Sequence, residues 1–233
     1  MFIHGSGENS NLWKEQFEDL NLKYNLISID LPSHGNSESV SDLSLELYVN
    51  VINGLIETLQ IKKVILCGHS LGGAIAQSYY FNYPQNVKAL ILVGTGGRLR
   101  VSPVILNALK SDFQEYLESI PLAAFYIKTN KSIINAIIED TSRIPQEVVY
   151  TDFSICDRFD TLDKTNTINI PCLIIIGKQD KLTPLKYSTF FNEKIKNSKL
   201  VVIDKAAHMV MLEKPDEFNK AIQEFIENHL ENK

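Results

Sequence analysis

A serine flanked by glycines offers the clearest chemistry in this sequence. Residues 68–72 read Gly-His-Ser-Leu-Gly, directly after the apolar run Val64–Cys67 and directly before a helical pattern. A serine on such a tight strand-to-helix turn adopts a strained backbone conformation, and its hydroxyl projects from the carboxyl end of the sheet. Because the strand and the helix are both in place, we predict that Ser70 is a nucleophile and not part of an ordinary glycine-rich turn.

A base must accompany this serine, because a serine hydroxyl is a weak nucleophile at its ordinary pKa. His208 suits the role, since it follows the apolar run Leu200–Ile203 by a short loop and is therefore expected at the carboxyl end of the sheet. The chain order serine, acid, histidine agrees with a serine on this kind of turn. We expect structural or surface roles for the other four histidines, which are His4, His34, His69 and His229.

A carboxylate must fix the tautomer of the base. Asp180 follows the apolar run Leu173–Ile176, which places it at the same end of the sheet. Asp204 is closer to His208 in sequence, but it ends its own strand four residues short and fits a loop-capping role better. The other apolar strand that could carry the acid runs into Gly-Thr-Gly-Gly at residues 94–97, without a carboxylate. We therefore predict Asp180 as the acid.

Two backbone N–H groups are expected to complete the site. Acyl transfer places negative charge on the carbonyl oxygen, and preorganised N–H donors stabilise that charge by several kcal/mol. Leu71, the residue after the nucleophile, is one predicted donor. The other is expected from residues 4–7, His-Gly-Ser-Gly, because glycines let the chain turn tightly around the carbonyl. We place this second donor at Ser6.

The elements that must position these residues follow an α/β pattern. Short apolar runs rich in β-branched residues alternate with longer amphipathic stretches, as in parallel strands joined by crossover helices. The predicted strands are Met1–His4, Tyr24–Asp30, Lys63–Gly68, Lys88–Gly94, Pro171–Gly177 and Lys199–Asp204. The predicted helices between them are Asn11–Leu20, Leu43–Gln60, Leu71–Asn82, Leu185–Lys194 and Pro215–Leu230. We therefore expect a mostly parallel sheet with flanking helices.

One long segment departs from this alternation. Between Gly97 and about Asn169 no apolar strand is found, and the pattern predicts helices over Pro103–Ser119 and Ser132–Asp140, with breaks at Pro121 and Pro145. Helices inserted between two sheet strands would lie on one end of the sheet as a cap. The alternative is a pair of ordinary crossover helices.

The length of the chain suits this organisation. At 233 residues it is large enough for one full α/β domain and too short for two of ordinary size. We expect a core made of residues 1–97 and 170–233, and a helical cap made of residues 98–169.

Composition excludes several classes of partner. The net charge of −5 comes without a basic stripe, so nucleic acid is not expected. No apolar run reaches the roughly 18 residues of a membrane helix, and no signal peptide is recognised, so we expect a cytoplasmic location without membrane contact. The cysteines Cys67, Cys156 and Cys172 are scattered without a CxxC spacing, which predicts reduced thiols and no metal site.

Five ordered motifs together resemble the α/β-hydrolase superfamily over nearly the whole chain. They are His4–Gly7, Asp30–Ser37, Gly68–Gly73, Gly177–Asp180 and Ala207–His208. Within that superfamily the chain is similar to the small, capped carboxylesterases and to their lactonase, meta-cleavage product hydrolase and peroxidase-like cousins. The resemblance implies a two-step acyl-enzyme mechanism without metal or organic cofactor. Serine at position 70 argues against the dehalogenase and epoxide hydrolase branches, which use an aspartate nucleophile.

Cleavage of small to medium apolar acyl or aryl esters is the leading hypothesis for the activity. The alternatives are a C–C bond hydrolase of meta-cleavage products, a lactonase or thioesterase, and a non-catalytic small-molecule receptor. We expect Leu106, Phe125 and Met209 to line the substrate pocket. Arg98 and Arg100, at the entrance of the predicted cap, could bind a substrate carboxylate or lie on the surface.

Two features depart from the superfamily pattern. Glu8 follows the glycine turn where relatives often have a small residue. The chain also begins at the strand that is usually third, so the usual first two strands are expected to be absent. The edge of Tyr24–Asp30 would then be bare, and bare strand edges invite pairing with another chain. We therefore expect a homodimer or aggregation through this edge, or a chain that is stabler with upstream residues restored.

Overall fold

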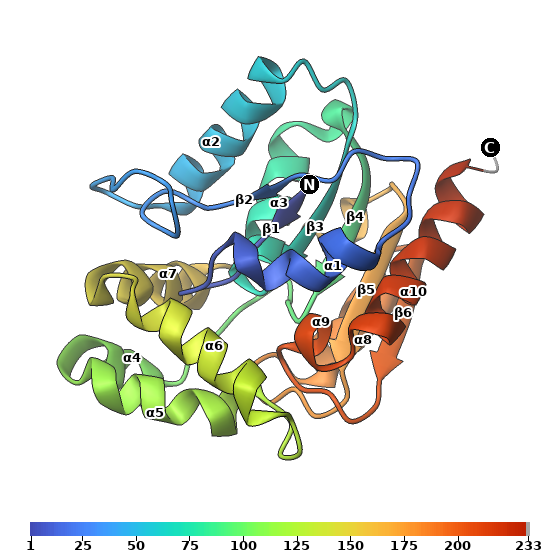
Figure 1. Cartoon of the computed structure of the whole chain (residues 1–233). Helices are drawn as coiled ribbons and strands as arrows, with labels where there is room; N and C mark the ends of the chain where they lie inside the picture. The colour runs from blue at the N-terminus through green and yellow to red at the C-terminus, as the bar shows by residue number, and fades with distance from the viewer. Residues whose placement is uncertain (232–233) are drawn as a thin grey trace.

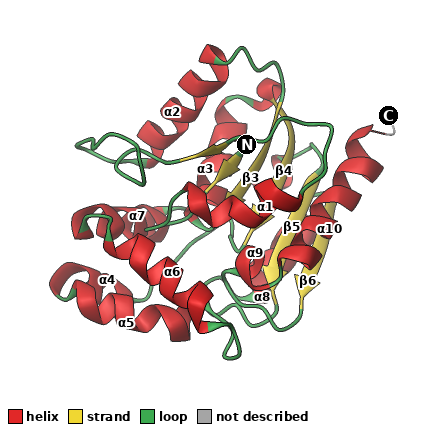
Figure 2. Cartoon of the chain, viewed as in Figure 1, coloured by secondary structure: helices red, strands yellow, loops and turns green. Residues whose placement is uncertain are grey.

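The computed structural model describes residues 1–231, and its centre is a parallel sheet of six strands. The strands lie in the order β2-β1-β3-β4-β5-β6, each parallel to its neighbours (Figure 2). Their bounds are β1 Phe2–Ile3, β2 Ser28–Ile29, β3 Val64–His69, β4 Val87–Val93, β5 Cys172–Gly177 and β6 Ser198–Ile203. The predicted α/β class with a mostly parallel sheet is confirmed.

Helices cover both faces of this sheet. Along β4, Ile91 and Val93 pack in one apolar cluster with η1, α9 and α10, whereas Leu90 and Leu92 pack in a second cluster with α2, α3 and α8. Strands buried on both faces are apolar throughout, as β5 is. The bounds of these helices are η1 Ser10–Trp13, α1 Lys14–Asp19, α2 Leu45–Thr58, α3 Leu71–Asn82, α8 Leu185–Lys194, α9 Val210–Glu213 and α10 Pro215–Ile226.

Four further helices connect β4 to β5. They are α4 Pro103–Ser111, α5 Phe113–Ala124, α6 Lys131–Ser142 and α7 Gln146–Arg158. Figure 1 shows them together below the lower ends of the strands, where the arrowheads of β5 and β6 also point. This group therefore lies beyond the carboxyl ends of the sheet, which is the end that holds the predicted site.

The prediction of one helix over Pro103–Ser119 is wrong. Two helices meet at Asp112, which leaves the helical conformation with φ −148° and ψ 87°. Its carboxylate accepts a hydrogen bond from the Glu115 backbone N–H at 3.0 Å and so caps α5. Pro121 lies inside α5 instead of ending it, and Pro145 directly precedes α7, a helix that the sequence pattern did not predict.

The predicted strand Tyr24–Asp30 is reduced to Ser28–Ile29. The reason is that β1 offers only Phe2 and Ile3 for pairing. β2 lies at one end of the sheet, with β1 as its neighbour. Pairing of a second copy along this edge stays a prediction, and light scattering on the 233-residue chain would test it.

Short turns complete the chain. They are the 3₁₀ turns η2 Pro84–Asn86 and η3 Thr165–Thr167, and the π-helical turn η4 Glu227–Glu231 after α10. Among residues 1–231, no helix has both the length and the apolar character needed to cross a lipid bilayer.

Candidate active site

Ser70 lies on the sharp turn between β3 and α3. Its φ of 51° and ψ of −113° are unusual for a residue with a side chain, and such strain costs on the order of 1–3 kcal/mol. The Ser70 N–H donates to the Val93 carbonyl at 3.0 Å, which ties the turn to β4. A Cβ on Gly72 would overlap the Ile3 carbonyl oxygen, and one on Gly68 would overlap the Gly72 carbonyl. Glycine at both positions therefore lets the turn close against β1.

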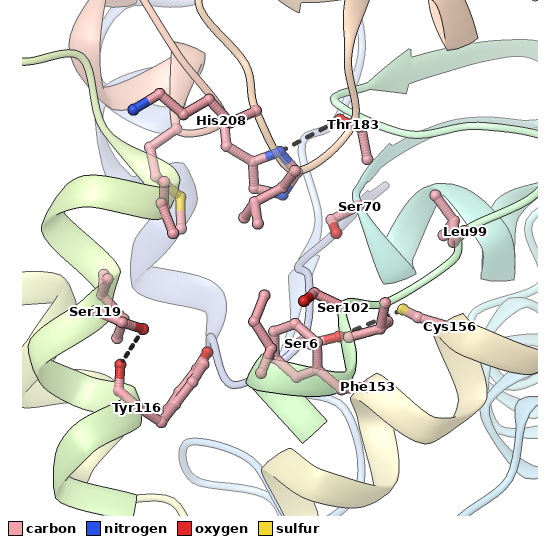
Figure 3. Close-up of a pocket in the computed structure, with 18 of the residues that line it drawn as sticks. Ser6, Ser70, Leu99, Ser102, Tyr116, Ser119, Phe153, Cys156, Thr183 and His208 are labelled. Carbon is pink, nitrogen blue, oxygen red and sulfur yellow. Dashed lines mark hydrogen bonds between the residues drawn. The ribbon is translucent and has the colours of Figure 1, made fainter. Parts of the chain in front are cut away.

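Asp180 and His208 come together from the loops after β5 and β6. Asp180 Oδ2 lies 2.8 Å from His208 Nδ1, and both side chains are almost fully buried. The Asp180 carboxylate also accepts hydrogen bonds from the Leu182 and Thr183 N–H groups, each at 2.9 Å, and from the Thr183 hydroxyl at 2.7 Å. This cradle fixes the carboxylate and directs Nδ1–H of His208 toward it, so the other ring nitrogen faces the cavity where Ser70 lies (Figure 3).

Burial and charge act in opposite directions on this pair. For His208, burial disfavours the imidazolium, but the charge of Asp180 and its hydrogen bond outweigh burial and raise the pKa. For Asp180, burial is again opposed by the charge and hydrogen bond of His208 and by the Thr183 donors, and the net effect is a lowered pKa. The carboxylate therefore stays ionised at neutral pH, which is the state that the predicted role of Asp180 beside a base requires.

Three hydrogen bonds hold the backbone at His208 and Met209. The His208 and Met209 N–H groups donate to the carbonyl of Ala124, at the end of α5, at 3.0 and 3.2 Å. The His208 carbonyl accepts from Nε2 of His69 at 3.1 Å, and Nδ1 of His69 lies 3.0 Å from Glu8 Oε2. His69 is therefore a buried link between the first loop of the chain and His208, and not a surface residue.

The loop after β1 lies beside the nucleophile. A Cβ built on Gly5 would lie 3.1 Å from Ser70 Cβ. The Gly5 N–H donates to Glu8 Oε2 at 2.6 Å and the Gly7 N–H donates to Asp152 Oδ2 at 3.2 Å. Among residues 1–231, the N–H of Ser6 between them has no protein acceptor, and neither has the N–H of Leu71 at the start of α3. Both predicted oxyanion donors thus lack a protein acceptor, and their binding of a substrate oxygen stays a prediction.

A cavity of about 290 Å³ opens over Ser70 (Figure 3). It lies between the loops of the sheet and α4–α7. Its walls are mainly apolar and include Ile105, Tyr116, Ile120, Ile137, Phe153 and Met209. Ser6, Ser70, Thr183 and His208 line it as well. Ser6, Ser70 and His208 therefore meet at one space that a small molecule can occupy, whereas Asp180 and Leu71 do not line it.

Of the three residues predicted for the pocket, only Met209 lines this cavity. Leu106 does not, because the neighbouring residue Ile105 faces the cavity and successive side chains of a helix point about 100° apart. Phe125 does not either: Ala124 lines the cavity, while Phe125 is buried in the apolar core. Neither residue therefore lines this cavity as predicted.

The sequence reasoning missed several residues that the structure places at the site. Glu8 lines the cavity and is buried, although the sequence marked it only as an unusual residue. Tyr116 belongs to α5, for which the only sequence signal was helical periodicity, and Phe153 belongs to α7, which the sequence pattern did not predict. Among residues 1–231, no group of three or more histidine, cysteine, aspartate and glutamate side chains is placed to hold a metal ion.

The parallel sheet, the strained serine turn and the Asp180–His208 pair define an α/β-hydrolase. Residues 1–215 match the family model Hydrolase_4, described as serine aminopeptidase, S33. The chain belongs to this family, and it is an enzyme with esterase activity of the serine hydrolase type.

Similar proteins are known both as structures and as sequences. A solved structure of a thermophilic esterase is 40% identical with a TM-score of 0.87, and the match covers 98% of this chain and 89% of that one. The esterase EaEST from Exiguobacterium antarcticum has a TM-score of 0.91 at 21% identity, with coverage of 97% and 91%, a likeness of fold. A pimeloyl-[acyl-carrier protein] methyl ester esterase of Neisseria meningitidis is 24% identical over 243 residues, covering 98% of this chain and 77% of that protein.

Proposed function

We propose that this protein is a carboxylesterase that cleaves small to medium apolar acyl or aryl esters through an acyl-enzyme at Ser70. The observation that carries the proposal is the position of Ser70 and His208 on the wall of one mainly apolar cavity. At about 290 Å³, this cavity is at the lower end of the roughly 300–1,000 Å³ common for small-molecule sites, which favours compact substrates. The names of two similar proteins, the thermophilic esterase and the pimeloyl-[acyl-carrier protein] methyl ester esterase, support an ester bond as the target.

The first half of the reaction forms the acyl-enzyme. The Ser70 hydroxyl oxygen attacks the ester carbonyl carbon while its proton passes to the cavity-facing ring nitrogen of His208, and Asp180 stabilises the resulting imidazolium. The N–H groups of Ser6 and Leu71 hold the negative carbonyl oxygen of the tetrahedral intermediate. When the carbon–oxygen bond of the ester breaks, His208 returns the proton to the leaving alcohol.

The second half repeats these roles with water. A water molecule gives a proton to His208 and attacks the acyl carbonyl, and the same two N–H groups hold the oxyanion. The bond to Ser70 then breaks, and its oxygen regains a proton from His208. The products are the carboxylic acid and the free enzyme.

The similar proteins include other hydrolases as well. One from Paraburkholderia phymatum is named for substrates with two carboxylates, the 2-hydroxy-6-oxononadienedioate and -nonatrienedioate. Such a substrate needs cationic partners. Arg98 Nε donates to Asp160 Oδ2 at 2.6 Å. Arg100 lines the cavity, but its guanidinium donates to the Asp157 carbonyl. Because these arginines already have partners, an apolar ester fits the lining better.

A substrate panel tests the proposed function. Aryl esters of increasing acyl length, from acetate to laurate, are assayed beside a dienone acid, with Ser70→Ala as the background control. We expect the highest kcat/KM for short to medium acyl chains and a decline for long ones, because the cavity is small. A dienone acid cleaved with higher kcat/KM than every ester would overturn the proposal in favour of C–C bond hydrolysis.

A further inference from the structure

Asp152 is a buried carboxylate in the middle of α7 that reaches the loops of the sheet. It is fully buried, and all its partners lie far from it in sequence. Oδ1 accepts a hydrogen bond from the Tyr48 hydroxyl at 2.6 Å. Oδ2 accepts from Nε2 of His34 at 2.9 Å and from the Gly7 N–H at 3.2 Å. A helix beyond the sheet is thereby bonded directly to the loop that carries Ser6.

Two neighbours of Asp152 on α7 contact the same loop. Val149 packs on Gly7, where an added Cβ would lie 3.1 Å from Val149 Cγ1. Cys156 Sγ lies 3.6 Å from Ser6 Oγ. Positions 149, 152 and 156 are three and four residues apart, so they share one face of the helix. One face of α7 therefore contacts both Ser6 and Gly7.

This contact bears on the direction of the Ser6 N–H. Gly7 has φ +67°, a conformation that glycine adopts readily, and its N–H points at Asp152. The Gly5 N–H is bonded to Glu8 in the same way. The His4–Gly5 and Ser6–Gly7 peptides, which flank the peptide that carries the Ser6 N–H, are thus each anchored by a buried carboxylate. Oxyanion donors are effective when they are fixed before the reaction begins, because no reorganisation is then needed in the transition state.

We propose that Asp152 is a positioning residue for catalysis, holding the Gly5–Gly7 loop so that the Ser6 N–H points at the developing oxyanion. The proposal rests on the proposed acyl transfer at Ser70. It makes α7 part of the catalytic apparatus as well as a wall of the cavity. Because Asp152 touches no reacting atom, its loss lowers the rate of acylation more than the binding of substrate.

Asp152→Ala tests this role, with Asp152→Asn as the conservative partner. Alanine removes the acceptor of the Gly7 N–H, and we expect kcat to fall about 100-fold, in the range seen when one oxyanion donor is lost. KM should stay within about threefold. The asparagine oxygen can still accept from Gly7 and His34 while its amide group faces the Tyr48 oxygen, so kcat should return to within about fivefold of the wild type. A folded alanine variant with unchanged kcat would overturn the proposal.

A second pair of variants decides the matter if Asp152→Ala does not fold. Val149 and Val148 are both buried on α7, but it is Val149 that packs on Gly7. The kcat of Val149→Ala should be about fivefold lower than that of Val148→Ala, at a similar loss of thermal stability. Equal kcat in these two variants would overturn the proposal.

The rate of labelling by a fluorophosphonate probe is measured alongside kcat in every variant. Phosphonylation of Ser70 uses the same N–H donors and requires no knowledge of the substrate. If the wild type is labelled but cleaves no ester of the panel, the proposed function fails while the labelling rates still test Asp152. Labelling that is as fast in Asp152→Ala as in the wild type would overturn the positioning role whichever substrate is used.

Discussion

Two buried aspartate–histidine pairs occur within residues 1–231, and their nitrogen–oxygen distances are nearly the same. Asp180 lies 2.8 Å from Nδ1 of His208, and Asp152 lies 2.9 Å from Nε2 of His34. All four side chains are almost fully buried. In both pairs the aspartate outweighs the effect of burial and raises the pKa of the histidine. Distance and charge alone therefore do not distinguish a catalytic pair from a structural one.

The second nitrogen of each ring makes the difference. In His34, Nδ1 lies 2.9 Å from the Pro32 carbonyl oxygen, so both ring nitrogens donate and neither can accept a proton. In His208, the second nitrogen faces the cavity that Ser70 lines (Figure 3). A buried aspartate–histidine pair thus acts as a base only where the ring has a free nitrogen toward a nucleophile. The same elements can otherwise hold two parts of the fold together.

Loss of the nucleophile should have the largest effect. Ser70→Ala removes a hydroxyl from a turn whose shape is set by Gly68 and Gly72, so the fold should be retained. We expect kcat for aryl esters to fall by a factor on the order of 10⁶, as when a serine protease loses its nucleophile. Activity above a few per cent of the wild type, measured on a protein with an unchanged thermal transition, would show that Ser70 is not the nucleophile.

The same substitution in each pair sharpens the comparison. Asp180→Asn should lower kcat by about 10⁴, because asparagine cannot hold His208 in the required tautomer. Asp152→Asn should keep kcat within about fivefold of the wild type. Asp204→Asn provides a second control, since Asp204 is exposed and bonded to Lys178 and Gln179, away from His208. Steady-state kinetics on the three variants would contradict the assignment if Asp204→Asn were the most damaging.

The ion pair that His34 adds to Asp152 should contribute to stability more than to chemistry. Its raised pKa means that the stabilisation is fully present below about pH 6.5, the ordinary histidine value, and is lost as pH rises through the folded-state pKa. We expect His34→Ala to lower the free energy of unfolding by about 3–5 kcal/mol at pH 6 and by less at pH 9. Urea unfolding of the wild type and the variant at both pH values measures this loss of unfolding free energy. A loss that is the same at both pH values would exclude a charged pair.

The pH profile should show the smallest effect. The base must be neutral to accept the serine proton, so kcat/KM should rise with pH through the pKa of His208, which Asp180 holds above about 6.5. In Asp180→Asn this support is lost, and the midpoint of the residual activity should move to lower pH. A flat profile from about pH 5 to 8 with chemistry rate-limiting, or an unmoved midpoint, would argue against His208 as the base.

The sequence was most informative where function depends on local chain geometry. The bounds of α3 and α8 agree with the predicted helices Leu71–Asn82 and Leu185–Lys194. The serine turn follows from neighbouring glycines, and the acid and base follow from the strands that precede them, because parallel strands end at one edge.

Contacts between distant segments were beyond the reach of sequence patterns. Asp152 meets Gly7 across 145 residues and His34 across 118, and nothing in the local pattern of α7 marks those partners. The pocket predictions failed for a related reason. Whether Ile105 or Leu106 faces the cavity depends on how α4 is rotated about its own axis, because successive residues lie about 100° apart. Tertiary packing decides that rotation.

The most direct test is to find which residue reacts with a fluorophosphonate probe. Intact mass and peptide mapping of the labelled wild type should give a single adduct on the peptide that contains Ser70. The adduct should be absent in Ser70→Ala and should form much more slowly in Asp180→Asn than in Asp152→Asn, because Asp180 serves the base. An adduct on another residue, or equal labelling rates in the two asparagine variants, would contradict the distinction between the two pairs.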